Sequence, residues 1–178
     1  NRVRSEFTKY LPAGYTLNNK GKVEYENSEY CGFVTLQLNS TDIMAKQANG
    51  VYWATYYNGA TGYRIDANEN ACAYTATVSN TTITLHKLGK VIPAGTAVIL
   101  VGDDNSITMS ISNDDAENLV ANDMQGVDVS TQTSSLGTGK FYVLGNKNSK
   151  FGFHEYTGNS MPARKAYLMI SVAAAHEL

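Results

Sequence analysis

The chain contains two stretches with one pattern, YTATVSNTTITLHKLGKVIPAGTAVIL at Tyr74–Leu100 and YVLGNKNSKFGFHEYTGNSMPARKAYLM at Tyr142–Met169. In each stretch a histidine follows the first tyrosine by twelve residues, and a Pro-Ala pair then precedes an apolar run. Alternating polar and apolar residues around a polar turn predict a β-hairpin, and the apolar run predicts a buried strand. The sequence therefore predicts a duplicated unit of hairpin, Pro-Ala corner and strand.

Short segments outside these stretches extend the β pattern. Phe33–Leu38 and Ile107–Ile111 alternate as half-buried strands do, and Val51–Tyr57 has the β-branched and aromatic residues of a central strand. Ala97–Val101 is apolar at every position, which predicts cover on both faces. Because turn signals recur about every ten residues, we predict an all-β sandwich or barrel of about ten short antiparallel strands.

Three segments do not fit the strand pattern. Ser40–Asp42 offers a helix N-cap, so Ile43–Ala48 is predicted to form one or two helical turns that end at Gly50. Ala116–Asn122 follows acidic residues suited to a helix start and is predicted as a second short helix. Val127–Thr138 is rich in Ser and Thr and is predicted to be a loop or lid over a sheet edge.

We divide the chain into an N-terminal β segment at 1–50, a duplicated β module at 51–170 and a tail at 171–178. The N-terminal segment is either separate from the module or integral to the same domain. Since Asn1 is not a natural start, we expect the chain to be a piece of a longer protein.

Composition and charge exclude some classes of partner. Charged residues make up 17% of the chain, against roughly 25% in globular domains, and the net charge is -2. A nucleic-acid partner requires a basic stripe that this sequence lacks. No apolar run is long enough to predict a transmembrane segment. Cys31 and Cys72 leave two interpretations open, a single disulfide or two buried thiols.

Five short motifs occur in a fixed order along the module: WATYY at Trp53–Tyr57, AYTA at Ala73–Ala76, VIPAGT at Val91–Thr96, YVLG at Tyr142–Gly145, and PA before AYL at Pro162–Leu168. Together they resemble β-rich accessory modules of secreted and surface proteins from Bacteroidetes and related gut bacteria. Such modules often lie near the C-terminus, after leucine-rich repeats or other extracellular domains. The resemblance covers about residues 51–170 and leaves residues 1–50 outside it.

The resemblance implies an extracellular or cell-surface location, a non-catalytic role and no cofactor. It brings no catalytic residues and no agreed ligand. The second unit departs from the family pattern, because Arg164 stands where the family has a glycine after its Pro-Ala pair. We expect this residue to affect the turn at that corner but not the strand that follows.

Several residues invite a catalytic or metal-binding hypothesis. His86 and His154 hold equivalent places in the two stretches, but both fall on the polar face of a predicted strand, and two histidines without a third ligand are an incomplete metal set. Cys31 has no sequence signature of a thiol nucleophile around it. The pairs Asp103–Asp104 and Asp114–Asp115 fit turn and cap chemistry better than a glycosidase or calcium site. We therefore predict no enzyme activity and no metal site.

The best candidates for ligand contact are Trp53, Tyr56, Tyr57 and Tyr63, because exposed aromatic rings mark binding surfaces. Strand alternation places Trp53 and Tyr57 on one face, with Tyr52 and Tyr56 on the other. One of these faces must belong to the core.

Two hypotheses of function follow. The first is a non-catalytic structural or interaction module of a larger secreted or cell-surface bacterial protein, whose partners are its neighbouring domains. The alternative is a glycan- or peptide-binding domain that uses the aromatic patch around Trp53 to hold a glycan or a host or cell-surface protein.

Overall fold

A computed structural model of the chain describes residues 15–17, 36–38, 40–80, 82–116 and 121–170. The chain divides into two compact units, residues 1–41 and 42–178. In the first unit, the strands β1 (Tyr15–Leu17) and β2 (Leu36–Leu38) form an antiparallel pair in which Tyr15 lies opposite Leu38. The predicted features of residues 18–35, Cys31 among them, lie outside the described residues.

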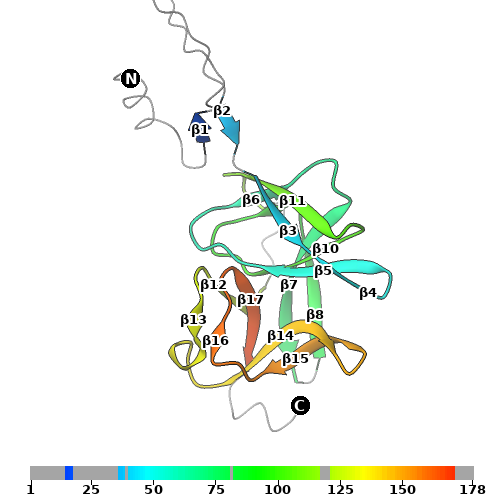
Figure 1. The fold of residues 1–178 in the computed structure, drawn as a ribbon, viewed down its shortest axis with the longest axis vertical. Helices are drawn as coiled ribbons and strands as arrows, with labels where there is room; N and C mark the ends of the chain where they lie inside the picture. Colours follow the sequence, from blue (N-terminus) through cyan, green and yellow to red (C-terminus); the bar gives the residue numbers. More distant parts are fainter. Residues whose placement is uncertain (1–14, 18–35, 39, 81, 117–120, 171–178) are drawn as a thin grey trace, which may run out of the picture. The chain divides into compact units, whose positions relative to one another are not determined.

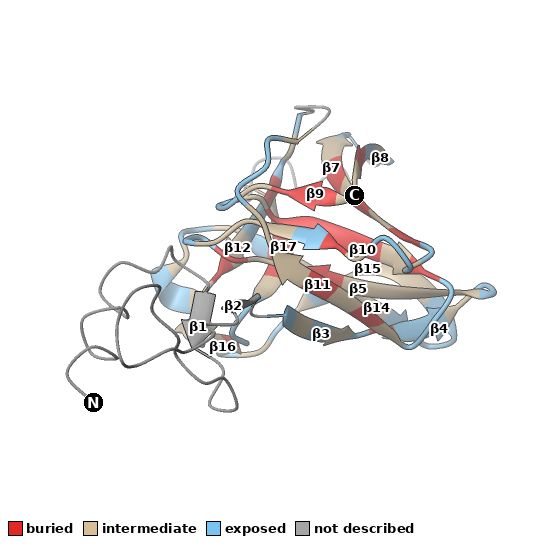
Figure 2. Cartoon of the chain, turned by 90° about the horizontal axis from the view of Figure 1, so that it is seen from above, coloured by how far each residue is buried: buried red, intermediate tan, exposed pale blue. Residues whose placement is uncertain are grey.

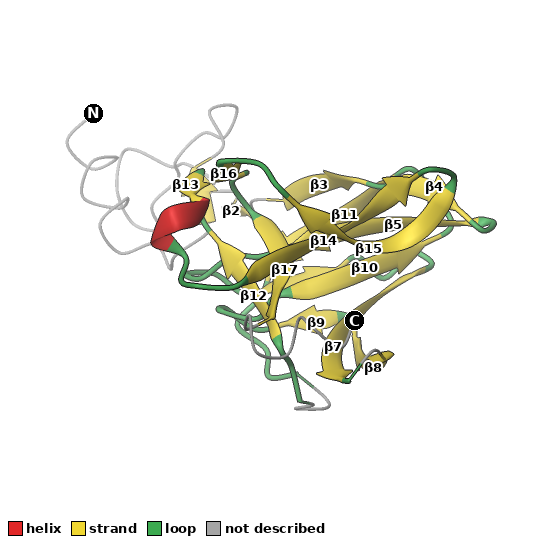
Figure 3. Cartoon of the chain, turned by 90° about the horizontal axis from the view of Figure 1, so that it is seen from below, coloured by secondary structure: helices red, strands yellow, loops and turns green. Residues whose placement is uncertain are grey.

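The described part of the second unit is built from strands, with no α-helix and one turn of 3-10 helix, η2 (Thr133–Ser135) (Figure 3). Its strands are β3 (Ser40–Met44), which begins two residues before the unit does, β4 (Lys46–Ala48), β5 (Val51–Tyr56), β6 (Tyr63–Ile65), β7 (Ala71–Ser79), β8 (Thr82–Gly89), β9 (Val91–Ile92), β10 (Val98–Gly102), β11 (Ser106–Ile111), β12 (Met124–Val127), β13 (Thr131–Gln132), β14 (Lys140–Lys147), β15 (Lys150–Tyr156), β16 (Ser160–Met161) and β17 (Lys165–Ile170). The prediction of an all-β antiparallel sandwich is confirmed.

A five-stranded sheet of order β4-β5-β10-β7-β8 lies between two further sheets, of order β3-β11-β6-β9 and β12-β17-β14-β15. Its middle strand, β10, is the most deeply buried, and Val98, Ile99 and Leu100 are each 0% exposed (Figure 2). The predicted cover on both faces of this apolar run is confirmed. A small β13–β16 pair completes the second unit.

Three apolar clusters hold these layers together. The first packs one face of the five-stranded sheet against the β3-β11-β6-β9 sheet, and includes Ile65, Leu100 and Met109. The second packs the opposite face against the β12-β17-β14-β15 sheet, and includes Ile99 and Leu168. The third lies within the last sheet and its β16 neighbour, and is built from Val127, Phe141, Met161 and Tyr167.

The two stretches that share a sequence pattern also share their strand pairing. In the first stretch β7 and β8 form a hairpin, β9 follows, and β10 returns to pair with β7. In the second, β14 and β15 form the hairpin, β16 follows, and β17 returns to pair with β14. The registers agree as well, since Tyr74 lies opposite Ile99, and its counterpart Tyr142 lies opposite Leu168.

The correspondence extends one strand upstream of the quoted stretches. Ile99 also lies opposite Thr55 of β5, and Leu168 lies opposite Met124 of β12. The β6–β9 pair corresponds in the same way to the β13–β16 pair. We call residues 51–102 the first half and residues 124–170 the second half; they run from cyan to green and from yellow to red in Figure 1. The second apolar cluster joins the two halves through equivalent strands.

The prediction of helical turns at Ile43–Ala48 is wrong, because Ile43 and Met44 lie in β3 and Lys46–Ala48 form β4. Gly50, where the predicted helix ended, instead forms with Asn49 the turn of a hairpin in which Ala48 lies opposite Val51. Both residues have positive φ, 53° and 83°, as the tight turn of a two-residue hairpin requires. An Asn-Gly turn between two strand-forming segments therefore outweighed the capping signal.

Two other expectations have mixed outcomes. Most of the helix expected at 116–122 falls on residues 117–120, which lie outside the described residues, and residues 121 and 122 are not helical. The polar segment at 127–138 is not wholly a loop, since it contains β13 and η2.

The buried Tyr56 gives the fold a dependence on alkaline pH. Its side chain is 4% exposed, and burial raises its pKa from 10.0 to about 12. The Tyr56 hydroxyl ionises at a lower pH in the unfolded chain than in the folded one. Its contribution to the free energy of unfolding is therefore present in full below pH 10 and falls by about 2 kcal/mol as the pH rises toward 12. Urea unfolding of the wild type and of Tyr56→Phe at pH 9 and pH 11.5 should show the smaller loss in the variant. An equal loss in both would contradict this role for Tyr56.

Candidate functional site

A pocket of about 330 Å³ lies where β5 of the first half faces β14 of the second half. Its wall combines aromatic, basic and backbone groups from several strands. The lining residues are Met44, Lys46, Gln47, Trp53, Ala54, Thr55, Leu144, Gly145, Asn146, Phe151 and Lys165. This volume falls in the range of small-ligand and side-chain binding pockets.

One wall of the pocket is aromatic. The rings of Trp53 and Phe151 lie with their centroids 5.1 Å apart and their planes at 45°. The indole Nε1–H of Trp53 donates to the carbonyl oxygen of Ala48 at 3.2 Å, which holds the ring in place. Ala48 is positioned by the Asn49-Gly50 turn, so the hairpin of β4 and β5 fixes the orientation of Trp53.

Two lysines supply the charge of the pocket. Lys165 is half-buried at the start of β17, and Lys46 is exposed on β4. Burial lowers the pKa of Lys165, and the positive charge of Lys46 lowers it further. Neither lysine forms an ion pair with a carboxylate among the described residues. An anion bound beside the two ammonium groups would offset both the repulsion between them and the desolvation penalty of Lys165.

A buried hydroxyl belongs to the same face. Thr55 lies between Trp53 and Tyr57 in the strand alternation and is 8% exposed. Its Oγ1 has no hydrogen-bond partner in the described part of the chain. A buried polar group in that state costs about 1–3 kcal/mol, so a polar group that reached it would gain a hydrogen bond.

The floor of the pocket includes a free strand edge. The β14–β15 hairpin turns at Asn148-Ser149, where both residues have positive φ, so Lys147 and Lys150 form its closing hydrogen-bonded pair. Hydrogen-bonded pairs alternate from that point, and the backbone groups of Leu144 and Asn146 therefore point away from β15. The pairing of β14 with β17 ends at Tyr142, so these groups have no strand beside them in the described structure.

No family model, no curated protein and no solved structure matches this chain. Among the described residues, no helix is long and apolar enough to cross a membrane.

The four aromatic residues predicted to contact a ligand do not form one surface. Trp53 lines the pocket, and Tyr57 lies on the same face, where its ring packs against the backbone of Gly126. Tyr56 and Tyr63 instead pack edge to face in the first cluster, with ring centroids 5.7 Å apart, and the amide of Asn58 donates to both hydroxyls. Both faces of β5 belong to the core, and Trp53 is the member of the four that reaches the pocket.

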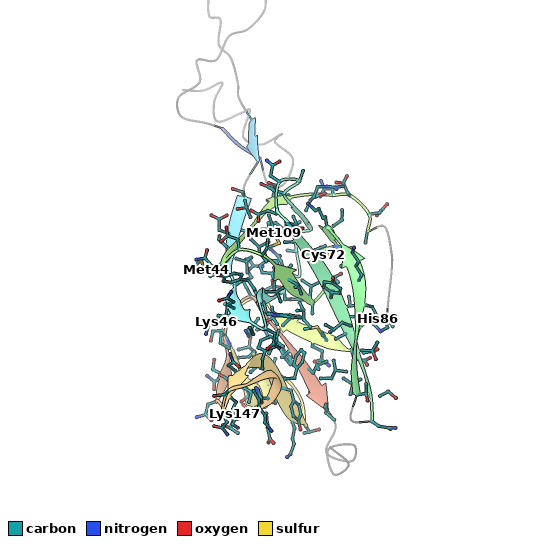
Figure 4. All side chains as sticks on the ribbon, turned by 90° about the vertical axis from the view of Figure 1, so that its right-hand side faces the viewer. Met44, Lys46, Cys72, His86, Met109 and Lys147 are labelled. Atoms are coloured by element: carbon teal, nitrogen blue, oxygen red, sulfur yellow. The ribbon has the colours of Figure 1, made fainter. Side chains whose placement is uncertain are left out.

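Neither of the two equivalent histidines lines this pocket, and each has a local hydrogen-bond partner. The Nε2 of His86 lies 2.8 Å from the hydroxyl of Thr77, across the unit from Met44 and Lys46 (Figure 4). The Nε2 of His154 lies 2.8 Å from the carbonyl oxygen of Lys150. Within the described residues, no three His, Cys, Asp or Glu side chains gather as metal ligands would.

The remaining candidates have local partners. Asp104 accepts from the backbone N–H of Asn105, and Asp114 accepts from Ser112 and forms an ion pair with Arg64, as turn and surface residues do. Cys72 is half-buried, with its Sγ 3.5 Å from the carbonyl oxygen of Gly89. Since Cys31 lies outside the described residues, both interpretations of the cysteines stay predictions.

Sequence reasoning missed the lysines, Thr55 and Phe151. Thr55 had a signal, because it shares a face with Trp53 in the alternation of β5. Lys46 was missed because it fell in the wrongly predicted helix, and Lys165 was missed because it was assigned to the Pro-Ala corner. The pairing of Trp53 with Phe151 joins the two halves and has no signal in either stretch alone.

The corner at Arg164 keeps the conformation of its glycine counterpart. Arg164 has a φ of 57°, and Gly95, at the same place in the first half, has a φ of 77°. The guanidinium of Arg164 also forms an exposed ion pair with Asp128, with Nη1 and Oδ1 2.7 Å apart. The expected change of turn is therefore absent, and the strand after the corner forms as predicted.

A positive φ costs a non-glycine residue about 1 kcal/mol, and an exposed ion pair contributes less than about 1 kcal/mol. We therefore expect Arg164→Gly, which loses the ion pair but relieves the strain, to leave the free energy of unfolding nearly unchanged, and Arg164→Ala, which keeps the strain, to lower it by less than about 1 kcal/mol. Urea unfolding of the three proteins measures this. Equal stability of the Ala and Gly variants would contradict the strain at this corner.

Proposed function

We propose that this chain is a non-catalytic interaction module of a larger secreted or cell-surface protein, and that the pocket beside Trp53 is its binding site. The observation that carries the proposal is the make-up of the pocket. An oriented aromatic wall, two lysines and a buried hydroxyl converge there without internal partners for the polar groups. Such a mixture of apolar surface and convergent polar groups is typical of binding sites.

The surroundings of the pocket also support binding rather than catalysis. The pocket lies between two sheets that the second apolar cluster packs against each other, so its shape is largely set before any ligand arrives. Its lining includes no His, Cys, Asp or Glu that would serve as nucleophile or general base. The expected location at the cell surface or outside the cell rests on the sequence resemblance.

A glycan is the second candidate ligand, and the aromatic wall is the observation that favours it. Sugar rings present apolar faces that stack on indole rings, and Asn146 and Gln47 line the same pocket with amide groups. The two free lysines and the strand edge are not explained by a neutral sugar, so the glycan ranks below a peptide.

Trp53 is the single tryptophan of the chain, so intrinsic fluorescence reports directly on the pocket. The full chain, residues 1–178, is screened against a display library of random peptides of about eight residues and against a glycan array. Each hit is then titrated in solution while Trp53 fluorescence is followed. We expect at least one class of hit to change the emission in a saturable way.

Matched threonine variants separate pocket binding from binding elsewhere. Thr55→Val keeps the shape of the side chain and removes the buried hydroxyl, so it should weaken a pocket ligand several-fold without loss of stability. Thr84→Val, on the exposed face of β8, should leave affinity unchanged. If no ligand of either class alters Trp53 fluorescence, or if both variants bind like the wild type, the proposed site is wrong.

A further inference from the structure

In the first half, strands β7 and β10 separate beyond the Tyr74–Ile99 pair. The free edge of β7 there consists of Ala76 and Val78, whose backbone groups point away from β8 because the hairpin closes at Ser79. We call this opening the first wedge. It is filled by residues 121–123 of the chain itself.

One backbone bond and several side-chain bonds hold this segment against the edge of β7. The backbone N–H of Asp123 donates to the carbonyl oxygen of Ala76 at 2.8 Å, and a carboxylate oxygen of Asp123 accepts from the N–H of Val78 at 2.7 Å. On the other side of the wedge, the amide of Asn122 donates to the carbonyl oxygen of Ala97 at 2.9 Å. Asp123 thus satisfies the edge of β7, and the amide of Asn122 satisfies the other side of the wedge.

The second half has the same opening, between β14 and β17 beyond the Tyr142–Leu168 pair. Leu144 and Asn146 hold the places of Ala76 and Val78, since both pairs lie at equal distances from their hairpin turns. We call this opening the second wedge, and the pocket beside Trp53 lies in it, because Leu144, Asn146 and Lys165 all line that pocket.

The chain does not fill the second wedge as it fills the first. Thr55 and Met124 hold equivalent places in the two halves, because they lie opposite Ile99 and Leu168. The counterparts of residues 121–123 are therefore residues 52–54. Those residues belong to β5, whose two edges already pair with β4 and β10, so their backbone groups cannot also bond to β14. The two halves differ because the segment that fills the first wedge is not part of a strand, whereas its counterpart, residues 52–54, belongs to the fully paired strand β5. The second wedge is therefore left open as the pocket.

We propose that the second wedge binds an extended peptide of a partner protein, which pairs with the edge of β14 at Leu144 and Asn146 and places a carboxylate side chain between Lys165 and Lys46. This inference rests on the proposed function and names its ligand. Strand addition to a free edge is a recurring mode of peptide recognition, in which backbone bonds give affinity and neighbouring pockets give specificity.

The charges of the two wedges favour an acidic side chain in the ligand. In the first wedge the acidic residue, Asp123, comes from the filling segment, and its carboxylate bonds to backbone N–H of β7. In the second wedge the fixed walls carry Lys165 and Lys46, with no carboxylate in the lining. The hydroxyls of a neutral sugar can bond to these groups, but they supply no negative charge for the lysines and do not repeat with the spacing of a strand edge.

The aromatic wall defines a second requirement. Trp53 and Phe151 lie beside the free edge, and the apolar side chain of Leu144 belongs to the same face. A strand presents alternate side chains to opposite sides, so the ligand is expected to carry an apolar residue two positions from its acidic one.

The experiment uses the full chain and peptides selected from the random display library. The consensus peptide, its analogue with Asp or Glu replaced by Asn or Gln, and a backbone N-methylated analogue are titrated by Trp53 fluorescence. We expect the amide analogue and the Lys165→Met variant each to weaken binding about tenfold or more, because charge-assisted bonds are lost. N-methylation at the residue facing β14 should abolish binding, whereas Lys147→Met, an exposed change on β14 outside the pocket, should not matter.

The outcomes separate this inference from the proposed function. A peptide that changes Trp53 fluorescence but tolerates the amide analogue, Lys165→Met and N-methylation overturns the inference and leaves the proposed site standing. Saturable binding of a glycan with no peptide hit also overturns it and leaves the site standing. Absence of any fluorescence change overturns both, and the predicted pattern of losses supports both.

Discussion

Leu168→Ala is expected to lower the free energy of unfolding by about 3 kcal/mol, and Ile99→Ala by a similar amount. Leu168 is 1% exposed and Ile99 is 0% exposed, and both lie in the cluster that joins the two halves. Each replacement removes buried methyl groups and leaves a cavity that two paired sheets cannot close. Urea unfolding monitored by circular dichroism gives both values.

The similarity of the two values is the informative part of this prediction. Ile99 and Leu168 hold the same register position in the two halves, so each should matter to the same extent if the halves pack through equivalent faces. Leu85→Ala, on β8 and 39% exposed, is the matched control and should cost about 0.5 kcal/mol or less. A cost below about 1 kcal/mol for either core variant would mean that the halves are not joined through this cluster.

Gly126→Ala is expected to destabilise the protein by about 3 kcal/mol, at the upper end for overpacking. A Cβ at this position would overlap the ring of Tyr57, which packs directly over the glycine. The contact joins β12 to the end of β5, so the ring cannot move without disturbing the junction of the two halves. The same unfolding measurement applies.

A second glycine and a double variant test the cause of that effect. Gly145 lies in β14 with nothing within 4 Å of an added Cβ, so Gly145→Ala should change the stability by about 0.5 kcal/mol or less. If the overlap with Tyr57 is the cause, Gly126→Ala should add little destabilisation in a Tyr57→Gly background, which also removes the Tyr57 Cβ that the added Cβ would overlap. Full additivity of the two changes would contradict the proposed overlap.

The succession of hairpin, corner and strand within each repeated stretch could be predicted from the sequence, whereas the order of the strands in the sheets could not. Alternation around the turns at Ser79–Asn80 and Asn146–Ser149 indicates hairpins, and the Pro-Ala pairs mark where the chain turns back, as the structure shows. The segment at 43–48 was mispredicted because an Asp cap and a following Gly imitate a helix, while the hairpin signal lay in the Asn49-Gly50 pair. Short apolar segments do not decide between helix and strand by themselves.

The candidate site was only partly predictable. Trp53 stands out in the sequence, but its aromatic partner Phe151 and the basic residue Lys165 come from strands about 100 residues later. The packing of the two halves brings these residues together. The alternation of β5 predicts that Tyr56 and Trp53 lie on opposite faces of the strand, but it does not show which of the two faces is buried. Both faces are buried here because the chain places one sheet on each side of β5.

The most direct test of this account compares amide hydrogen exchange at the two wedges in the free protein. The N–H groups of Ala76 and Val78 are covered by residues 122 and 123, whereas those of Leu144 and Asn146 have no partner among the described residues. We therefore predict slow exchange at Ala76 and Val78 and fast exchange at Leu144 and Asn146, measured residue by residue by NMR. Equal protection at both pairs would contradict the account, because the edge of β14 would then already be occupied by the chain itself.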